Sequence, residues 1–153
     1  VRGAFFNPFQ SAPSDFYDPG FVSRREPLLR RRFAEIALPG AMARIVLASF
    51  AGKYGISNPL VNWSALSEIL LRQALERIPL DHWRSMLQRL LGDLRQHRSG
   101  MPDLVYFPST GGYEWIEVKG PGDRLQKNQR RWLAFFAAQS IPHRVLHVAW
   151  LTA

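Results

Sequence analysis

The sequence contains no cysteine among its 153 residues. This absence excludes a disulfide framework and a zinc site built from thiolates. The sequence also has no signal peptide and no apolar run of about 18 residues, so no membrane span is predicted. Histidine is scarce, and its spacing matches no HExxH or comparable metal motif, so we expect packing or surface roles. The four residues are His82, His97, His143 and His147.

Acidic residues are also few. Against 20 Lys and Arg stand only 12 Asp and Glu, which gives a formal net charge of +8 and an isoelectric point near 10.8. This balance favours a polyanionic partner such as nucleic acid. The alternative is that the charge only keeps the protein soluble, and composition leaves both readings open. The length fits one domain with one hydrophobic core.

The most informative stretch lies between residues 100 and 123. Two short runs of β-branched and aromatic residues, Leu104–Phe107 and Tyr113–Val118, flank the turn-forming segment Pro108–Gly112. This pattern predicts a β-hairpin. Pro102 precedes the first strand, where the lack of an N–H is tolerated.

The second predicted strand carries two charges within an apolar run. Because side chains alternate along a strand, Glu117 and Lys119 share one face, and Val118 is expected to point to the other, into the core. Asp103 reaches the same spot if the hairpin pairs in this way. Two carboxylates suit Mg²⁺, and a nearby lysine can stabilise charge that develops on a phosphate. The alternative is a solvated Glu-Lys ion pair, the usual meaning of this spacing alone.

Five helices are expected from apolar periodicity and from residues suited to helix ends. They run from a Ser23 cap to about Ile36, from Ala41 to about Lys53, from a Ser64 cap through Ile78, from an Asp81 cap to just before Gly100, and from an Asp123 cap to about residue 138. The third should bury a stripe formed by Leu66, Ile69, Leu70 and Ala74.

A final strand, Arg144–Trp150, completes a βαβ unit with Tyr113–Val118 and the fifth helix. The predicted fold class is therefore α/β, with a small mixed sheet, a hairpin, a βαβ unit and a largely helical N-terminal half. Residues 1–20 combine prolines and aromatics and are expected to be irregular. Their aromatic residues need burial; they include Phe5, Phe6, Phe9 and Phe16.

Gln129 is the polar exception on the apolar face of the fifth helix. A buried amide needs hydrogen-bond partners, so Gln129 either caps backbone groups or points into the site. Several basic residues are candidates for contact with DNA phosphates, although a solvated basic face is the usual explanation of a charge run. These candidates are Arg24, Arg25, Arg124, Lys127, Arg130 and Arg131.

Taken together, these residues resemble a known nuclease superfamily. Pro102-Asp103 followed by Glu117-Val118-Lys119 resembles the PD-(D/E)xK signature, and the run Glu117–Leu125 with Gln129 and Trp132 resembles its VRR-NUC branch. Further similarity to the C-terminal nuclease domains of Fanconi-associated nucleases lies in Phe21–Arg25, Arg98–Asp103 and His147-Val148. The resemblance runs from about Phe16 to Trp150.

The resemblance implies a restriction-endonuclease-like core and a metal-dependent phosphodiesterase. Its catalytic residues would be Asp103, Glu117, Lys119 and Gln129, and Mg²⁺ or Mn²⁺ would bind Asp103, Glu117 and the backbone carbonyl of Val118. The implied activity is that of a 5′-flap endonuclease and 5′ to 3′ exonuclease in DNA interstrand-crosslink repair. The implied location is intracellular, in the cytoplasm or nucleoid of a bacterium or the nucleus of a eukaryote.

Three alternatives remain, the first within the same chemistry and the other two from different classes. One is a stand-alone VRR-NUC enzyme that resolves four-way junctions, against which the long helical stretch 41–98 argues. Another is a DNA-binding module with a decayed site, against which the retained Asp103, Glu117 and Lys119 argue. The third, a protein-interaction domain, would not explain the hairpin.

Enzymes of this superfamily add a carboxylate from a helix that precedes the sheet. Glu35 and Glu68 are weak substitutes, so we expect that carboxylate upstream of Val1. A first residue other than methionine points the same way and predicts the C-terminal module of a longer enzyme, whose upstream domains are partners. We expect an irregular segment 1–20 and a nuclease domain 21–153, with a helical part at about 21–99 and the hairpin and βαβ unit at about 100–153.

Overall fold

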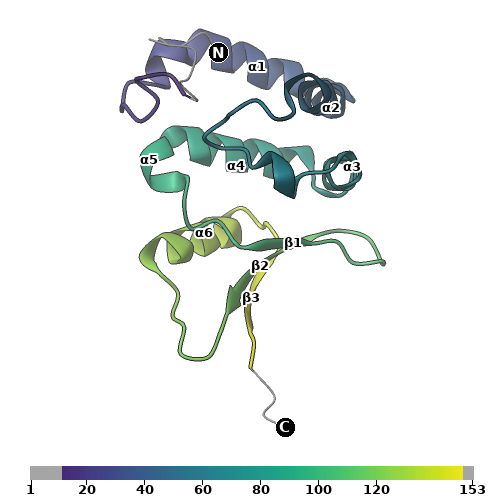
Figure 1. Ribbon diagram of the computed structural model, residues 1–153, viewed down its shortest axis with the longest axis vertical. Coiled ribbons are helices and arrows are strands. Elements are labelled where there is room, and N and C mark those ends of the chain that lie inside the picture. Colours follow the sequence, from purple (N-terminus) through teal and green to yellow (C-terminus); the bar gives the residue numbers. More distant parts are fainter. Residues whose placement is uncertain (1–11, 150–153) are drawn as a thin grey trace. The chain divides into compact units, whose positions relative to one another are not determined.

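The computed structural model describes residues 12–149 (Figure 1). They form two compact units. The first comprises the described residues up to Glu76 together with Leu91–Arg95, and the second comprises Arg77–Leu90 and the residues from Gln96 onward. The predicted burial of Phe5, Phe6 and Phe9 and the predicted strand end at Trp150 lie outside the described residues.

The first unit is helical. After a turn of 3₁₀ helix, Ser23–Arg25, it contains α1 (Glu26–Ile36) and α2 (Ala41–Lys53), and it continues through a second 3₁₀ turn, Trp63–Ala65, into α3 (Glu68–Arg77). The predicted bounds of α2 are confirmed. The residues buried in this unit include Phe16, Phe21, Ile36 and Ala41. Between residues 12 and 149 no single helix is long and apolar enough to cross a membrane, and Ser23–Ile36 and Ala41–Lys53 pass that test only as a pair bent by 112°.

The predicted cap of the first helix is wrong. The Ser23 hydroxyl donates a hydrogen bond to the carbonyl oxygen of Gly20 at 3.0 Å instead of accepting one from the helix. The regular helix begins only at Glu26, and Arg25, which precedes it, makes no side-chain cap. A serine hydroxyl can bond to backbone groups of a turn as well as to those of a helix end, and Ser23 bonds to the turn.

The start of the third helix is also misplaced. Ser64 lies in the 3₁₀ turn, where its N–H donates to the Asn62 side chain at 3.2 Å. Ser67 is the residue that caps α3, since its hydroxyl oxygen accepts the N–H of Leu70 at 3.1 Å. The apolar stripe is correspondingly different, and Ile69, predicted to be buried, is 80% exposed.

The second unit contains most of α4 (Leu80–Gly92) and the end of α5 (Leu94–His97). We expected one continuous helix from an Asp81 cap to just before Gly100. Instead, Asp81 lies in the first turn of α4, which ends at Gly92, a residue that is unfavourable within helices. After Asp93, α5 adds a single short turn.

A three-stranded sheet and one helix complete this unit (Figure 1). The strands β1 (Leu104–Tyr106), β2 (Glu114–Lys119) and β3 (His143–His147) lie in that order, and α6 (Lys127–Ala138) connects the last two. β1 pairs with β2 in antiparallel fashion, and β2 pairs with β3 in parallel. The hairpin and the βαβ unit are therefore confirmed, although β3 begins one residue earlier than predicted and already ends at His147, before Val148 and Ala149.

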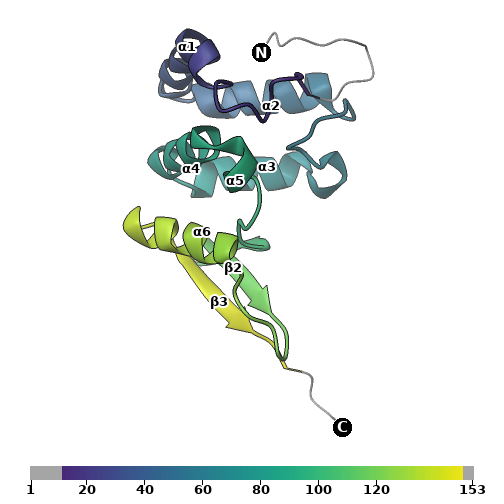
Figure 2. The same ribbon diagram turned by 90° about the vertical axis from the view of Figure 1, so that its left-hand side faces the viewer.

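Helix α6 packs on one face of the sheet (Figures 1 and 2). On this face the ring centroids of Trp115 and Phe136 lie 6.0 Å apart. Since alternate residues of β2 share a face, Glu117 and Lys119 lie on the same side as Trp115 and are buried. Val118, predicted to be the buried one, is only half-buried on the other face. The charged pair thus lies beneath the helix.

Candidate active site

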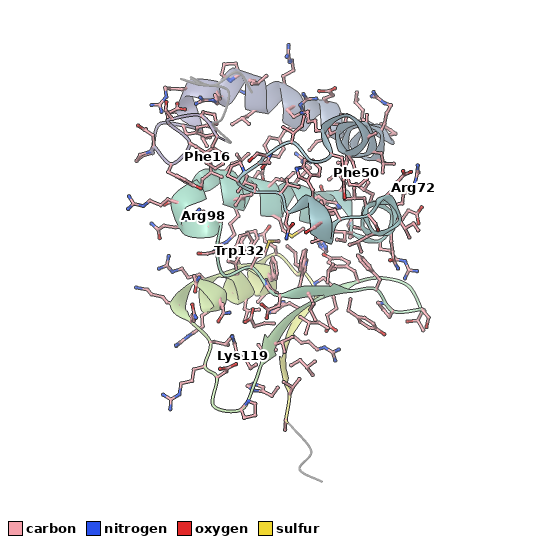
Figure 3. All side chains as sticks on the ribbon, in the orientation of Figure 1. Phe16, Phe50, Arg72, Arg98, Lys119 and Trp132 are labelled. Atoms are coloured by element: carbon pink, nitrogen blue, oxygen red, sulfur yellow. The ribbon has the colours of Figure 1, made fainter. Side chains whose placement is uncertain are left out.

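The centre of the candidate site is a hydrogen-bonded cluster between β2 and α6. Glu117 is 1% exposed and Lys119 is 7% exposed. The Lys119 ammonium lies 2.7 Å from Oε1 of Glu117 and donates a hydrogen bond to Oε1 of Gln129 at 3.1 Å. Nε2 of Gln129 in turn donates to Oε1 of Glu117 at 2.5 Å. Each of the three side chains therefore contacts the other two, and Figure 3 shows Lys119 near the end of β2.

Electrostatics keep the lysine of this cluster charged. The hydrogen bond with Glu117 raises the pKa of Lys119 above its usual value, and burial opposes this effect without cancelling it. The negative charges of Glu117, Asp123 and Asp103 raise the pKa further. The site therefore holds a fixed cation beside its carboxylates at neutral pH.

Asp103 lies next to this cluster at the edge of the hairpin. Leu104 pairs with Ile116, so the register places Asp103 opposite Glu117. Its Oδ2 atom accepts the backbone N–H of Val118 at 2.9 Å. This contact orients the exposed carboxylate against β2, as the hairpin pattern predicts.

The residues of the site fit a divalent cation. Oε1 of Glu117 is occupied by Lys119 and Gln129, but its Oε2 is buried and has no hydrogen-bond partner among the described residues. A buried, unpaired carboxylate oxygen is costly, and a hard cation shared with Asp103 would satisfy it. Within the described part of the chain, no cluster of three or more acidic, His or Cys side chains is placed to hold a metal.

The two weak candidates for a third carboxylate lie in exposed helical ion pairs. Glu35 pairs with Arg32 at 2.8 Å, and Glu68 pairs with Arg72 at 2.6 Å.

Gln129 combines both roles that the sequence left open. Besides its contacts in the site, its Oε1 atom accepts the backbone N–H of Gln126 at 2.9 Å. Gln126 is the N-cap of α6, and the two glutamines form a reciprocal capping box. The predicted Asp123 cap is wrong, because the Asp123 carboxylate accepts the N–H of Gly120 at 2.9 Å and closes the preceding turn.

Comparison with known proteins identifies the family. The VRR-NUC domain matches residues 39–150. This chain belongs to the VRR-NUC family. The predicted resemblance is thereby confirmed, and it places the buried Glu117 and Lys119 within a nuclease family.

Similarity to individual proteins extends over the whole chain. The chain is 41% identical over 151 residues to the Fanconi-associated nuclease 1 homolog of Pseudomonas aeruginosa, and the match covers 98% of the chain and 27% of the relative. It is 32% identical to Fanconi-associated nuclease 1 of Danio rerio, covering 97% of the chain and 15% of the relative. The chain thus spans about a quarter or less of these relatives.

The fold is shared with a solved structure of similar sequence. The crystal structure of paFAN1 bound to 1nt 5′ flap DNA with gap superposes with a TM-score of 0.92 at 40% identity. The match covers 100% of the chain and 28% of the solved chain. The predicted fold class, a restriction-endonuclease-like α/β core with a helical N-terminal half, is confirmed.

The predicted DNA-binding residues of this VRR-NUC chain fall into two groups. Arg24 and Arg25, in the first unit, both form ion pairs with Asp15 at 2.9 Å. The hydrogen bond from Arg25, followed by that from Arg24, holds the pKa of Asp15 below its usual value against the opposing effect of burial. Arg25 also stacks over the Phe21 ring at 4.1 Å, so its guanidinium is committed within the fold.

The other group lies along the start of α6 and its entry loop. Arg124 and Lys127 are exposed and form no ion pair within residues 12–149. Nε of Arg130 donates to the carbonyl oxygen of Leu125 at 3.0 Å, and Nη1 of Arg131 donates to Oε1 of Gln96 at 2.7 Å. These side chains are exposed, with charge available to solvent.

Two further residues lie near the site: His147, which we expected only in a packing or surface role, and Asn128, which was not singled out from the sequence. His147 pairs with Lys119 in the β2–β3 register and so shares its face of the sheet. Asn128 precedes Gln129 on α6, and its Nδ2 atom donates to the Ser99 hydroxyl oxygen at 3.3 Å. The βαβ prediction, with a register, could have located His147. Nothing local to the sequence marks Asn128.

Proposed function

We propose that this chain is a metal-dependent DNA nuclease domain that hydrolyses phosphodiester bonds. The observation that carries the proposal is the buried Glu117 carboxylate, which has one oxygen held by Lys119 and Gln129 and the other unpaired beside Asp103. Membership of the VRR-NUC family supports it and implies a divalent cation. We propose that this cation is Mg²⁺ or Mn²⁺, since hard oxygen ligands suit both.

The residues of the site divide the work between them. Asp103, Glu117 and the carbonyl of Val118 would hold the cation, which when bound would neutralise negative charge on the phosphate. Lys119 would stabilise the charge that develops on the phosphoryl oxygens as water adds to phosphorus and a P–O ester bond breaks, with a proton passing to the departing oxygen. Gln129 would hold Glu117 and Lys119 in place. The mutual hydrogen bonds and burial of Glu117, Lys119 and Gln129 support this division, because phosphoryl transfer depends mainly on the positioning of the reacting groups.

We propose DNA with a 5′ flap or another branch as the substrate. The support is the similarity to paFAN1, which has been solved with 1nt and with 2nt 5′ flap DNA. Activity as a 5′-flap endonuclease and 5′ to 3′ exonuclease in interstrand-crosslink repair, at an intracellular location, follows from this likeness to Fanconi-associated nucleases. Two other substrate or activity classes stay as alternatives: four-way junctions cut by a stand-alone VRR-NUC enzyme, and DNA bound without cleavage.

Cleavage assays separate these possibilities. The protein is incubated with 5′-flap, 3′-flap and four-way-junction DNA, with Mg²⁺, with Mn²⁺ and with EDTA. We expect metal-dependent cutting of the 5′ flap, abolished in Asp103→Asn and Glu117→Gln, two variants that keep the shape of each side chain. Preferential cutting of four-way junctions would favour the stand-alone type of enzyme. Binding of DNA without cleavage in either metal would overturn the nuclease proposal.

A further inference from the structure

The segment that leads to Asp103 is fastened to α6 by a buried indole. Nε1 of Trp132 donates hydrogen bonds to the carbonyl oxygens of His97 at 3.1 Å and Ser99 at 3.2 Å. Trp132 is 2% exposed, and the guanidinium of Arg89 lies over its ring, 4.9 Å from the ring centre. The indole is therefore fixed on both its edge and its face.

One residue further along, the backbone itself touches the helix. Gly100 has a φ angle of +86°, which favours glycine. A Cβ atom placed on Gly100 would lie 2.6 Å from the backbone carbonyl carbon of Asn128 and 2.8 Å from its Cβ and Cγ atoms. Because one of these atoms is backbone, no side-chain rotation can make room. The amide of Asn128 also bonds the Ser99 side chain.

Only Met101 and Pro102 separate this contact from Asp103. Pro102 is buried and its ring fixes φ, so the backbone between Gly100 and Asp103 has little conformational freedom. The next contact along the chain is the hydrogen bond from the Val118 N–H to the Asp103 carboxylate. Displacement of Gly100 from α6 would therefore move the Asp103 carboxylate.

The same turn of α6 also carries Gln129, which binds Glu117. Asn128 and Trp132 contact the segment before Asp103, while Gln129 donates a hydrogen bond to the carboxylate of Glu117. We infer that α6 sets the spacing between Asp103 and Glu117, and that Gly100 and Trp132 are positioning residues for the divalent cation. This inference rests on the proposed metal site. It adds that the spacing of the two carboxylates, held by α6, determines which cations the site binds.

The chemistry of the cations makes the inference measurable. Mg²⁺ demands near-ideal octahedral geometry at short distances, whereas Ca²⁺ accepts longer and more varied ones. A displaced Asp103 should therefore weaken Mg²⁺ binding more than Ca²⁺ binding. Loss of stability alone, with the folded site unchanged, would not alter the ratio of the two affinities.

The test compares Gly100→Ala with Gly111→Ala. Gly111 also has a positive φ, +100°, but a Cβ there meets nothing within 4 Å, so it is matched for backbone strain without the close approach. Binding of Mn²⁺ is followed by loss of the free-ion EPR signal, and Mg²⁺ and Ca²⁺ are measured by their displacement of Mn²⁺. We expect Gly100→Ala to lose about tenfold in Mg²⁺ affinity and clearly less in Ca²⁺ affinity, while Gly111→Ala binds both as the parent protein does.

Trp132→Phe provides a second variant should Gly100→Ala not fold. It retains an aromatic ring but removes the N–H that binds the two carbonyl oxygens, together with part of the buried indole, and the same change in the Mg²⁺ to Ca²⁺ ratio is expected. Asp103→Asn tests the proposed site itself. If Asp103→Asn abolishes Mn²⁺ binding while the folded glycine and tryptophan variants bind normally, the metal site stands and the positioning role is refuted. If Asp103→Asn binds Mn²⁺ normally, the proposed site fails and the inference fails with it.

Discussion

Replacement of Gln129 by alanine should affect stability and catalysis by separable amounts. The variant loses the hydrogen bond to the charged Glu117, worth about 1.5–3 kcal/mol, and one half of the capping box, worth about 1 kcal/mol. The free energy of unfolding should therefore fall by about 2.5–4 kcal/mol. Since Glu117 and Lys119 also lose a shared partner that orients them, the cleavage rate should fall about tenfold.

Gln126→Ala is the matched control. Gln126 supplies the other half of the same capping box, and within residues 12–149 the hydrogen bonds of Glu117 and Lys119 do not involve its side chain. It should cost about 1 kcal/mol and leave the rate unchanged. Urea unfolding gives the stabilities, and single-turnover cleavage of a 5′-flap DNA at saturating Mn²⁺ gives the rates. An unchanged rate in Gln129→Ala, or an equal loss of rate in Gln126→Ala, would reduce Gln129 to a helix cap.

Three further predictions concern the charged residues of the site and of α6. Asp103→Ala or Glu117→Ala should remove metal-dependent cleavage while circular dichroism shows the fold intact; undiminished turnover in both would refute the ligand assignment. Lys119→Ala should lower the single-turnover rate about a hundredfold and DNA affinity far less; an equal fall in affinity would make Lys119 a phosphate anchor. Replacing Arg130 and Arg131 together should flatten the slope of log affinity against log salt by about two units, measured by fluorescence anisotropy, similarly for all DNA sequences. An unchanged slope would place that surface away from DNA.

The sheet was predictable because its signals are local. Turn residues between two short apolar runs specify the hairpin, and a parallel return strand follows from the intervening helix. The same alternation showed that Glu117 and Lys119 share a face. It could not show which face a helix would cover, so the prediction that Val118 is the buried residue was wrong.

Helix starts were less predictable, because the side chains that cap helices also close turns. Asp123 bonds the N–H of Gly120 and Ser23 bonds a preceding carbonyl, so neither serves the helix that follows it. The contact of Gly100 with Asn128 depends on the meeting of segments 28 positions apart in the sequence. No local pattern encodes such an approach.

The stretch Arg24–Arg32 of the first unit contains five arginines, and their ion pairs determine how much of this positive charge a ligand can use. Four of its five arginines already have carboxylate partners: Arg24 and Arg25 pair with Asp15, Arg30 with Glu26, and Arg32 with Glu35. Within residues 12–149, Arg31 alone of the five lacks one. A phosphate that approaches this stretch would therefore compete with these carboxylates, because it must displace one of them before it can bind the paired arginine. Fewer counterions would then be released than the number of arginines suggests, so that number overstates the attraction of this surface for nucleic acid.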